Sequence, residues 1–127
     1  MVDNKKVLLI DDDVDLITIN KRILEKNGYA VSTAYNGEEG IKKAENESPD
    51  LIILDVMMTT KSEGFEVSRE LRENNRTRNI PLLMLTSVNK TVPFNFEPDE
   101  TWLPVDVFLD KPVRPQLLVT KVKEMIG

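Results

Sequence analysis

The sequence predicts an α/β protein with a doubly wound parallel sheet that helices cover on both faces. Short apolar runs without polar alternation, such as residues 51–54, are typical of strands buried on both faces of a sheet. Segments with helical spacing of apolar residues lie between these runs, as right-handed βαβ crossovers require. Several of the runs end in a polar residue. Ligands of such sheets bind outside the carboxyl ends of the strands, so these polar residues are the first candidates for function.

Five strands are expected from the apolar runs. The first, third and fourth are almost purely apolar, whereas the second alternates loosely between apolar and polar residues. The expected strands cover residues 7–10, 29–34, 51–55, 82–86 and 105–110.

Four helices are expected in the order of the chain. Asp12 or Asp13 caps the start of the first helix, and Asn27-Gly28 ends it. The second covers residues 38–47 after a turn or cap at 36–37, the third about 65–75 and the last 115–126. Apolar residues recur at helical spacing in the first helix, at Leu16, Ile17, Ile19, Ile23 and Leu24, and lie on one side of the last, at Leu117, Leu118, Val122, Met125 and Ile126.

Length and composition predict one globular domain over residues 1–127. The hydrophobic share of 40% and the charged share of 31% are typical of globular proteins, and the sequence contains no internal repeat or interdomain linker. The net charge is −5 without a basic stripe, which argues against nucleic acid as a partner. Apolar runs of about four residues are far too short to cross a bilayer, and the start does not resemble a secretory signal. A cytoplasmic protein is therefore expected.

The absence of two residue types restricts the chemistry. The sequence contains no Cys, so disulfides and thiolate metal sites are excluded, and no His, the commonest general base. Carboxylates, hydroxyls, Lys and backbone groups remain.

Four strand ends carry polar residues that can meet at the carboxyl edge of the sheet. They are Asp11 to Asp13, Asp55, Thr86 and Lys111. Each one alone is more often a turn former, a helix cap or a solvated residue. Together, two or three close carboxylates repel one another and favour a bound cation. Oxygen ligands favour Mg²⁺ or Mn²⁺, and the hydroxyl and the lysine suit a phosphoryl group.

At this spacing the sequence resembles the receiver domain of two-component response regulators over nearly its whole length. The residues that carry the resemblance are Leu9-Ile10-Asp11-Asp12-Asp13, the run PDLIILDVMM at 49–58, Thr86, and Phe108-Leu109-Asp110-Lys111-Pro112. The resemblance implies a flavodoxin-like fold with strand order 2-1-3-4-5. It also implies Mg²⁺-dependent phosphorylation by a histidine kinase or a histidine phosphotransfer protein.

The resemblance assigns a role to each matched residue. Asp55 would be the phosphoacceptor, and Asp11 and Asp12 would bind Mg²⁺ together with Asp55 and the backbone carbonyl of Met57. Asp13 follows the acidic pair and is a weaker candidate ligand. Thr86 and Lys111 would bind the phosphoryl oxygens, Lys111-Pro112 would be a cis peptide, and Phe108 would be a switch aromatic that moves with Thr86.

The sequence departs from the family pattern in two segments. The loop after Asp55 lacks the usual proline and is one residue longer, which changes the surface that a kinase would meet. The interval from Thr86 to Lys111 is about three residues longer than usual and contains three prolines, so a shortened or missing fourth helix is expected. Phe94, Phe96 and Trp102 within it either pin a long loop to the domain or form a docking surface.

Met57 and Val88 occupy the two positions that flank the attacking water in the family. Both are apolar and cannot orient that water through a hydrogen bond. A long-lived phosphorylated form is therefore expected.

Three other interpretations fit parts of the sequence. Asp11 to Val14 also resembles the motif of haloacid-dehalogenase-like phosphatases, with Asp11 as nucleophile and Asp13 as acid–base, but this leaves Asp55 without a role. A degenerate receiver would bind partners without phosphorylation, although every matched site residue is present. A calcium-binding EF-hand loop fails because Leu16 and Arg22 replace its Gly and Glu.

The output is expected to require a partner. No effector domain follows Gly127 in the sequence, so a stand-alone receiver would act by binding another protein or by passing the phosphoryl group on, unless the chain is part of a larger regulator. Apart from its own phosphorylation and dephosphorylation, no enzymatic activity is expected.

Overall fold

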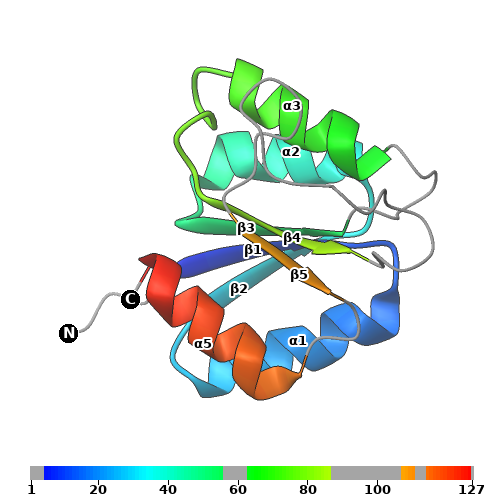
Figure 1. Cartoon of the computed structure of the whole chain (residues 1–127). Helices are drawn as coiled ribbons and strands as arrows, with labels where there is room; N and C mark the ends of the chain where they lie inside the picture. The colour runs from blue at the N-terminus through cyan, green and yellow to red at the C-terminus, as the bar shows by residue number, and fades with distance from the viewer. Residues whose placement is uncertain (1–4, 56–62, 87–106, 111–113, 127) are drawn as a thin grey trace.

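A parallel sheet lies between two layers of helices (Figure 1). The computed structural model describes residues 5–55, 63–86, 107–110 and 114–126; within them, the side chains of residues 55, 63–65, 86 and 107–110 fall outside the description. The expected α/β class and the alternation of strands and helices are confirmed.

The described elements follow one another in a regular order. The strands are β1 (Lys6–Ile10), β2 (Ala30–Ala34), β3 (Leu51–Asp55), β4 (Leu82–Thr86) and β5 (Val107–Asp110). The helices are α1 (Val14–Lys26), α2 (Gly37–Glu47), α3 (Glu63–Glu73) and α5 (Pro115–Ile126).

The sheet has the order β2-β1-β3-β4-β5, and every neighbouring pair is parallel. This order confirms the flavodoxin-like topology. The chain reverses its direction of travel across the sheet after β2, when it passes β1 to form β3. Side chains from β1 and β3 therefore lie next to each other at the switch point, where ligands of doubly wound sheets bind.

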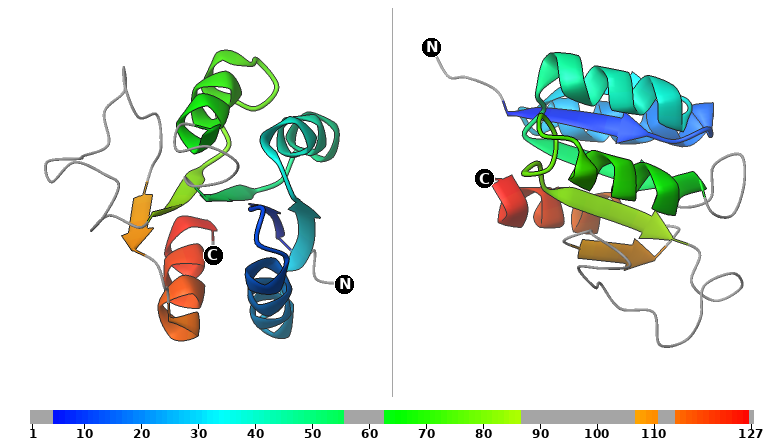
Figure 2. Two further views of the ribbon diagram at one scale, coloured as in Figure 1. Left: turned by 90° about the vertical axis from the view of Figure 1, so that its right-hand side faces the viewer. Right: turned by 90° about the horizontal axis from the view of Figure 1, so that it is seen from above.

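The apolar strands separate two hydrophobic clusters because successive strand residues point to opposite faces. On one face, alternate residues of β1, β3 and β4 pack with Ala44, Val67 and Leu71 of α2 and α3. On the other, the intervening strand residues pack with Ile17 and Leu24 of α1 and with α5. Figure 2 shows the two helix pairs on opposite sides of the sheet. Burial on both faces explains why these strands contain almost no polar residues.

Local hydrogen bonds determine where α1 begins and ends. The Asp13 carboxylate accepts hydrogen bonds from the backbone N–H groups of Asp15 and Leu16, both at 3.1 Å, which confirms it as the N-cap. After the helix, Gly28 adopts a φ of 94°. The N–H groups of Gly28 and Tyr29 then bond back to carbonyls of the last turn, as in a Schellman motif. The start of α1 is thereby held directly after the Asp11-Asp12-Asp13 run.

Several details differ from the sequence-based expectation. β2 begins at Ala30, and Tyr29 is a buried residue before it. Burial raises the pKa of the Tyr29 phenol. Ile19 and Leu117, which belong to the apolar helical patterns, are 51% and 42% exposed and so lie outside the core. Helix α3 begins at Glu63 rather than near residue 65.

The segment 87–104, for which a shortened or missing fourth helix is expected, lies outside the described residues.

Candidate functional site at the carboxyl edge of the sheet

Strand pairing brings the expected site positions into one row. The last paired positions of β1 and β3 are Ile10 and Leu54, so Asp11 and Asp55 are the next residues on two neighbouring strands. Neighbouring strands lie about 4.8 Å apart. The backbones of these two aspartates are therefore close at the switch point of the sheet.

The row continues across the other strands. Asp55 pairs with Leu85, so Thr86 comes one position later on β4. Thr86 in turn pairs with Asp110, the last residue of β5, and Lys111 follows it in the chain. All four expected strand ends thus reach the same edge of the sheet. Phe108 pairs with Met84, two positions further from that edge.

Asp11 is a nearly buried carboxylate at the end of β1. The residue is 5% exposed, and its backbone N–H extends the ladder to β2 through a 3.0 Å bond to the Ala34 carbonyl. One carboxylate oxygen accepts a 2.9 Å hydrogen bond from the backbone N–H of Asp13. A carboxylate has about four acceptor positions, so the Asp13 N–H alone does not saturate the Asp11 carboxylate. The Asp13 N–H, in the turn that begins α1, therefore orients one oxygen of the Asp11 carboxylate.

Asp12 and Asp13 differ in what their side chains do. Asp12 is exposed at the bend between β1 and α1. Asp13 is also exposed, but one of its carboxylate oxygens accepts hydrogen bonds from backbone N–H groups in the first turn of α1. That role supports the pairing of Asp11 with Asp12 as candidate metal ligands. It also argues against the phosphatase alternative, which needs Asp13 as a free acid–base.

Part of the expected site lies outside the described residues. This holds for the side chains of Asp55, Thr86 and Phe108 and for all of Met57, Lys111 and Pro112. Among the described side chains, no group of three carboxylates surrounds a common point. The all-oxygen donor chemistry of Asp11 and Asp12 nevertheless fits a hard divalent cation, and Asp55 is the neighbouring residue that would complete the set.

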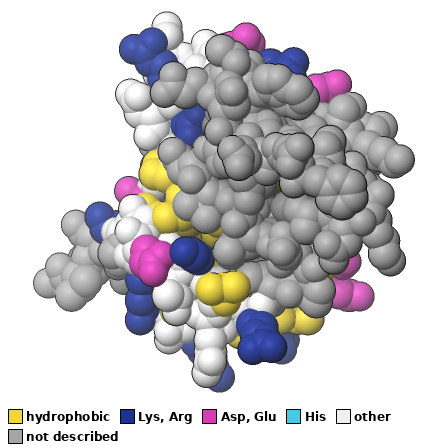
Figure 3. Space-filling view, viewed as in Figure 1, with side chains coloured by type: hydrophobic (Ala, Val, Ile, Leu, Met, Phe, Trp, Pro, Cys, Tyr) yellow, Lys and Arg dark blue, Asp and Glu magenta, His cyan; other side chains and the backbone are white. Residues whose placement is uncertain are grey.

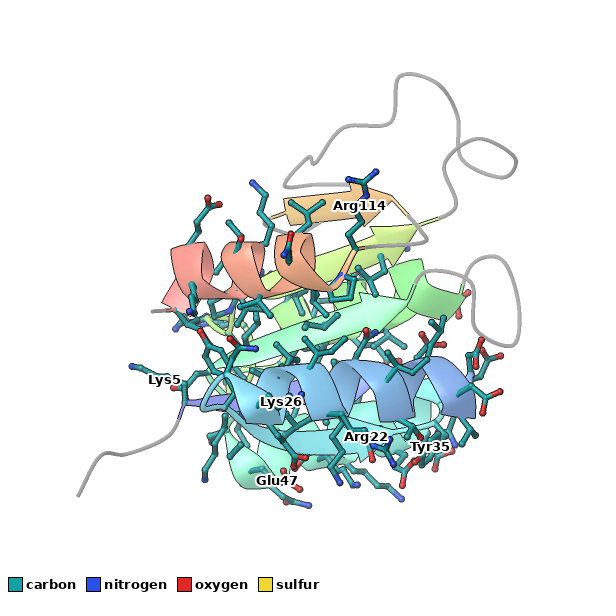
Figure 4. The ribbon with its side chains drawn as sticks, turned by 90° about the horizontal axis from the view of Figure 1, so that it is seen from below. Lys5, Arg22, Lys26, Tyr35, Glu47 and Arg114 are labelled. Atoms are coloured by element: carbon teal, nitrogen blue, oxygen red, sulfur yellow. The ribbon has the colours of Figure 1, made fainter. Side chains whose placement is uncertain are left out.

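A second set of charged groups lies at the amino end of the sheet, opposite the site (Figure 4). Figure 4 shows Tyr35 after β2 and Arg114 before α5 at the carboxyl end, whereas Lys5 and Glu47 lie at the opposite end. At that opposite end, the Asp50 carboxylate accepts a 2.8 Å hydrogen bond from the backbone N–H of Lys6. Asp50, directly before β3, and Asp55, its last residue, therefore lie at opposite ends of this strand.

Sequence reasoning overlooked Asn20 of α1. This residue is only 8% exposed, on the face of the helix that also buries Ile17 and Leu24. The spacing 17, 20 and 24 contained the signal, because these positions share one helical face. A polar residue on that stripe could have been identified from the sequence.

The fold and this arrangement define a phosphoacceptor signalling domain, and sequence comparison agrees. The family model of the response regulator receiver domain matches residues 7–123, so the chain belongs to this family. Receiver domains are signalling modules of two-component systems rather than classical enzymes, and they accept a phosphoryl group from histidine kinases. They bind Mg²⁺ in their active site.

Curated relatives include longer regulators. The chain is 40% identical over 126 residues to the alkaline phosphatase synthesis transcriptional regulatory protein PhoP of Bacillus subtilis, covering 97% of this chain and 49% of that protein. It is 36% identical over 121 residues to the transcriptional regulatory protein CpxR homolog of Haemophilus influenzae, covering 95% of this chain and 50% of that protein. The chain thus spans about half the length of the curated relatives it matches.

Solved structures share the fold over almost the whole chain. The chemotaxis response regulator CheY4 of Vibrio cholerae has a TM-score of 0.82 at 28% identity, covering 97% of this chain and 99% of that chain. The receiver domain of the sensor histidine kinase PA1611 of Pseudomonas aeruginosa has a TM-score of 0.82 at 22% identity, covering 98% and 99%. That structure holds a magnesium ion in its active-site cleft. At this identity the likeness shows the fold alone.

The outer surface carries charges of both signs. Figure 3 shows Lys and Arg side chains interspersed with Asp and Glu over the described part of one face. None of the described helices is both long and apolar enough to span a membrane.

Proposed function

We propose that Asp55 is the phosphoacceptor of this receiver domain and that residues 1–127 form one such domain. The observation that carries the proposal is the register of β1, β3, β4 and β5. It aligns the positions of Asp11, Asp55, Thr86 and Asp110 along one edge, with Lys111 next in the chain. Asp55 occupies the middle of this row, at the switch point of the sheet.

The carboxylate of Asp55 acts as the nucleophile. One of its oxygens attacks the phosphorus of a phosphohistidine on a histidine kinase or a histidine phosphotransfer protein. An oxygen–phosphorus bond forms, the nitrogen–phosphorus bond breaks, and the imidazole leaves and takes up a proton. Thr86 donates a hydrogen bond to a phosphoryl oxygen, and Lys111 provides a positive charge to another.

Asp11, Asp12, Asp55 and the Met57 carbonyl would hold Mg²⁺, and Mn²⁺ would suit the same oxygens. The cation supplies charge neutralisation between the carboxylates and the phosphoryl oxygens. The near-complete burial of Asp11 and its bond from the Asp13 N–H support this role, since they orient its carboxylate before any ligand binds.

Phosphorylation biases a conformational equilibrium through Thr86 and Phe108. The register places Phe108 on β5, next to β4, which ends in Thr86. A phosphoryl group that draws the Thr86 hydroxyl changes the space available to the neighbouring aromatic ring. The output is the altered binding of another protein. The receiver domain catalyses only two reactions, the phosphorylation and the dephosphorylation of its own aspartate.

A small phosphodonor tests the proposal without the kinase. In the presence of Mg²⁺ and acetyl phosphate, intact mass spectrometry should detect one added phosphoryl group on the wild-type protein and none on Asp55→Asn. Asp50→Asn is the matched control, because Asp50 flanks the other end of β3 and its amide can still accept the Lys6 N–H bond. Modification of Asp55→Asn at the wild-type level would refute the assignment.

The phosphorylated form should be long-lived. Met57 and Val88 offer no hydrogen bond to an attacking water, so hydrolysis receives little assistance from these side chains. The decay of the phosphorylated mass after removal of acetyl phosphate measures this lifetime. A half-life of only seconds would contradict the expectation, and Val88→Glu should change the decay rate if this position matters.

A further inference from the structure

Asn20 is a polar residue on the buried face of α1. It is 8% exposed and shares the buried face of the helix with Ile17 and Leu24. Asparagine is mostly exposed in folded proteins, because a buried amide loses hydrogen bonds to bulk water that other partners must replace. Arg22, labelled in Figure 4, is exposed two positions further along the same helix. An apolar residue would be the expected occupant of position 20.

A small cavity lies next to Asn20, beneath the carboxyl edge of the sheet. Asp11 and Asn20 line it together with apolar residues of α1, β1, β3 and β4, among them Ile17, Leu9, Ile53 and Leu85. Ile53 lies two positions before Asp55, and Leu85 directly precedes Thr86. The cavity therefore adjoins the proposed phosphoacceptor site from the side of α1 and α5.

The size and the lining of the cavity suit one water molecule. The volume available to the centre of a water molecule is about 10 Å³, close to the smallest volume that a buried water needs. Cavities that remain dry are lined by apolar groups, whereas a buried water usually has two to four polar partners. The Asn20 amide supplies a donor and an acceptor, and a carboxylate such as that of Asp11 has about four acceptor positions, one of which receives the Asp13 N–H.

We infer that Asn20 is a positioning residue for the metal site: it holds one buried water that hydrogen-bonds to Asp11. The water fixes the Asp11 carboxylate from the core side, while the Asp13 N–H fixes it from the start of α1. Groups that orient a metal ligand in this way raise the affinity for the metal. This inference rests on the proposed function, because it assumes that Asp11 binds Mg²⁺.

The first test is whether the water exists. On ¹⁵N-labelled, metal-free protein, water-to-protein nuclear Overhauser spectra should show a long-lived water at the Asn20 side-chain amide. No such signal is expected at the exposed Asn46 amide. A crystal structure at high resolution would show the same water as a density peak between Asn20 and Asp11. A dry cavity would overturn the inference.

The second test is the Mg²⁺ affinity, measured by titration of the backbone amide signals of Asp11 and Asp12. Asn20→Leu has a similar shape, fills the cavity and removes the amide, so the dissociation constant for Mg²⁺ should rise about tenfold. Asn20→Ser has a hydroxyl that can bind the water, so its Mg²⁺ affinity should lie between those of the wild type and Asn20→Leu. Thr18→Leu on the exposed side of α1 is the control and should bind as the wild type does.

Thermal unfolding of the metal-free proteins separates positioning from a structural role. Asn20→Leu should unfold at the wild-type temperature or above it, because the buried amide is replaced by an apolar side chain. Equal Mg²⁺ affinity of Asn20→Leu and wild type would overturn the inference alone. Failure of the wild-type protein to bind Mg²⁺, or unchanged binding in Asp11→Asn, would overturn the proposed metal site and the inference together.

Discussion

Asp11→Asn should weaken Mg²⁺ binding at least tenfold and slow phosphorylation by acetyl phosphate about 10²-fold. The amide removes one negative charge from a residue that is 5% exposed, so little solvent screens the loss. The Asn oxygen can still accept the 2.9 Å bond from the Asp13 N–H, and the local fold should survive. Mg²⁺ titration by NMR and the rate of mass increase with acetyl phosphate measure the two effects.

Asp15→Asn is the matched control for this prediction. Asp15 lies four residues further along the chain, in the first turn of α1, where it is exposed. The substitution removes the same charge from the same end of the molecule but leaves the strand end unchanged. Equal losses in Asp11→Asn and Asp15→Asn would show that only the overall charge matters, and would remove Asp11 from the metal site.

Gly40→Leu should lower the free energy of unfolding by about 3 kcal/mol. Helix α2 packs so closely on β1 that a Cβ at position 40 would lie 2.5 Å from Cδ1 and 2.8 Å from Cγ1 of Ile10. The helix would have to move away from the strand to admit a larger side chain at position 40. Urea unfolding monitored by circular dichroism measures the change, and Asn46→Leu on the exposed side of α2 should remain within about 0.5 kcal/mol of wild type.

A double-mutant cycle tests this contact directly. Ile10→Val removes Cδ1, the atom nearest to the added Cβ. Gly40→Ala combined with Ile10→Val should therefore be less destabilised than the sum of the single variants, by at least about 0.5 kcal/mol. Strict additivity would mean that the helix shifts away from the strand and that Ile10 does not limit position 40. Ile10 directly precedes Asp11, so this packing also holds the start of the site.

The strands could be predicted from the sequence because the physical signal is local. Leu51 and Leu54 are fully buried and Ile53 nearly so, as an apolar run in a two-sided sheet requires. The N-cap at Asp13 and the stop at Gly28 were also local signals, and both are confirmed by the hydrogen bonds and the φ angle.

Helix faces were less predictable. Ile19 fits an apolar spacing in α1, yet the helix turns Ile17, Asn20 and Leu24 inward and leaves Ile19 51% exposed. Periodicity identifies a helix, but neighbouring elements decide which of two partly apolar faces is buried. The burial of Asn20 could have been inferred from its spacing with Ile17 and Leu24, but only the sheet beneath α1 reveals that Asn20 lines a cavity with Asp11.

The site could be predicted as a set of residue types, but its geometry depends on strand order. Asp11 and Asp55 are far apart in the sequence, and nothing local places β1 beside β3. The resemblance to receiver domains implied this neighbourhood, and the pairing of Ile10 with Leu54 confirms it. The roles of Asp55, Thr86 and Lys111 stay predictions, because their side chains lie outside the described residues.

The most direct test of Asp55 as phosphoacceptor is to locate the residue that carries the phosphoryl group. After phosphorylation by acetyl phosphate, borohydride reduces an aspartyl phosphate to homoserine, which peptide mass spectrometry locates to a single residue. We expect homoserine at position 55 and unmodified aspartate at positions 11, 12 and 13. Homoserine at position 11 with an intact Asp55 would contradict the proposal and would favour the phosphatase-like chemistry instead.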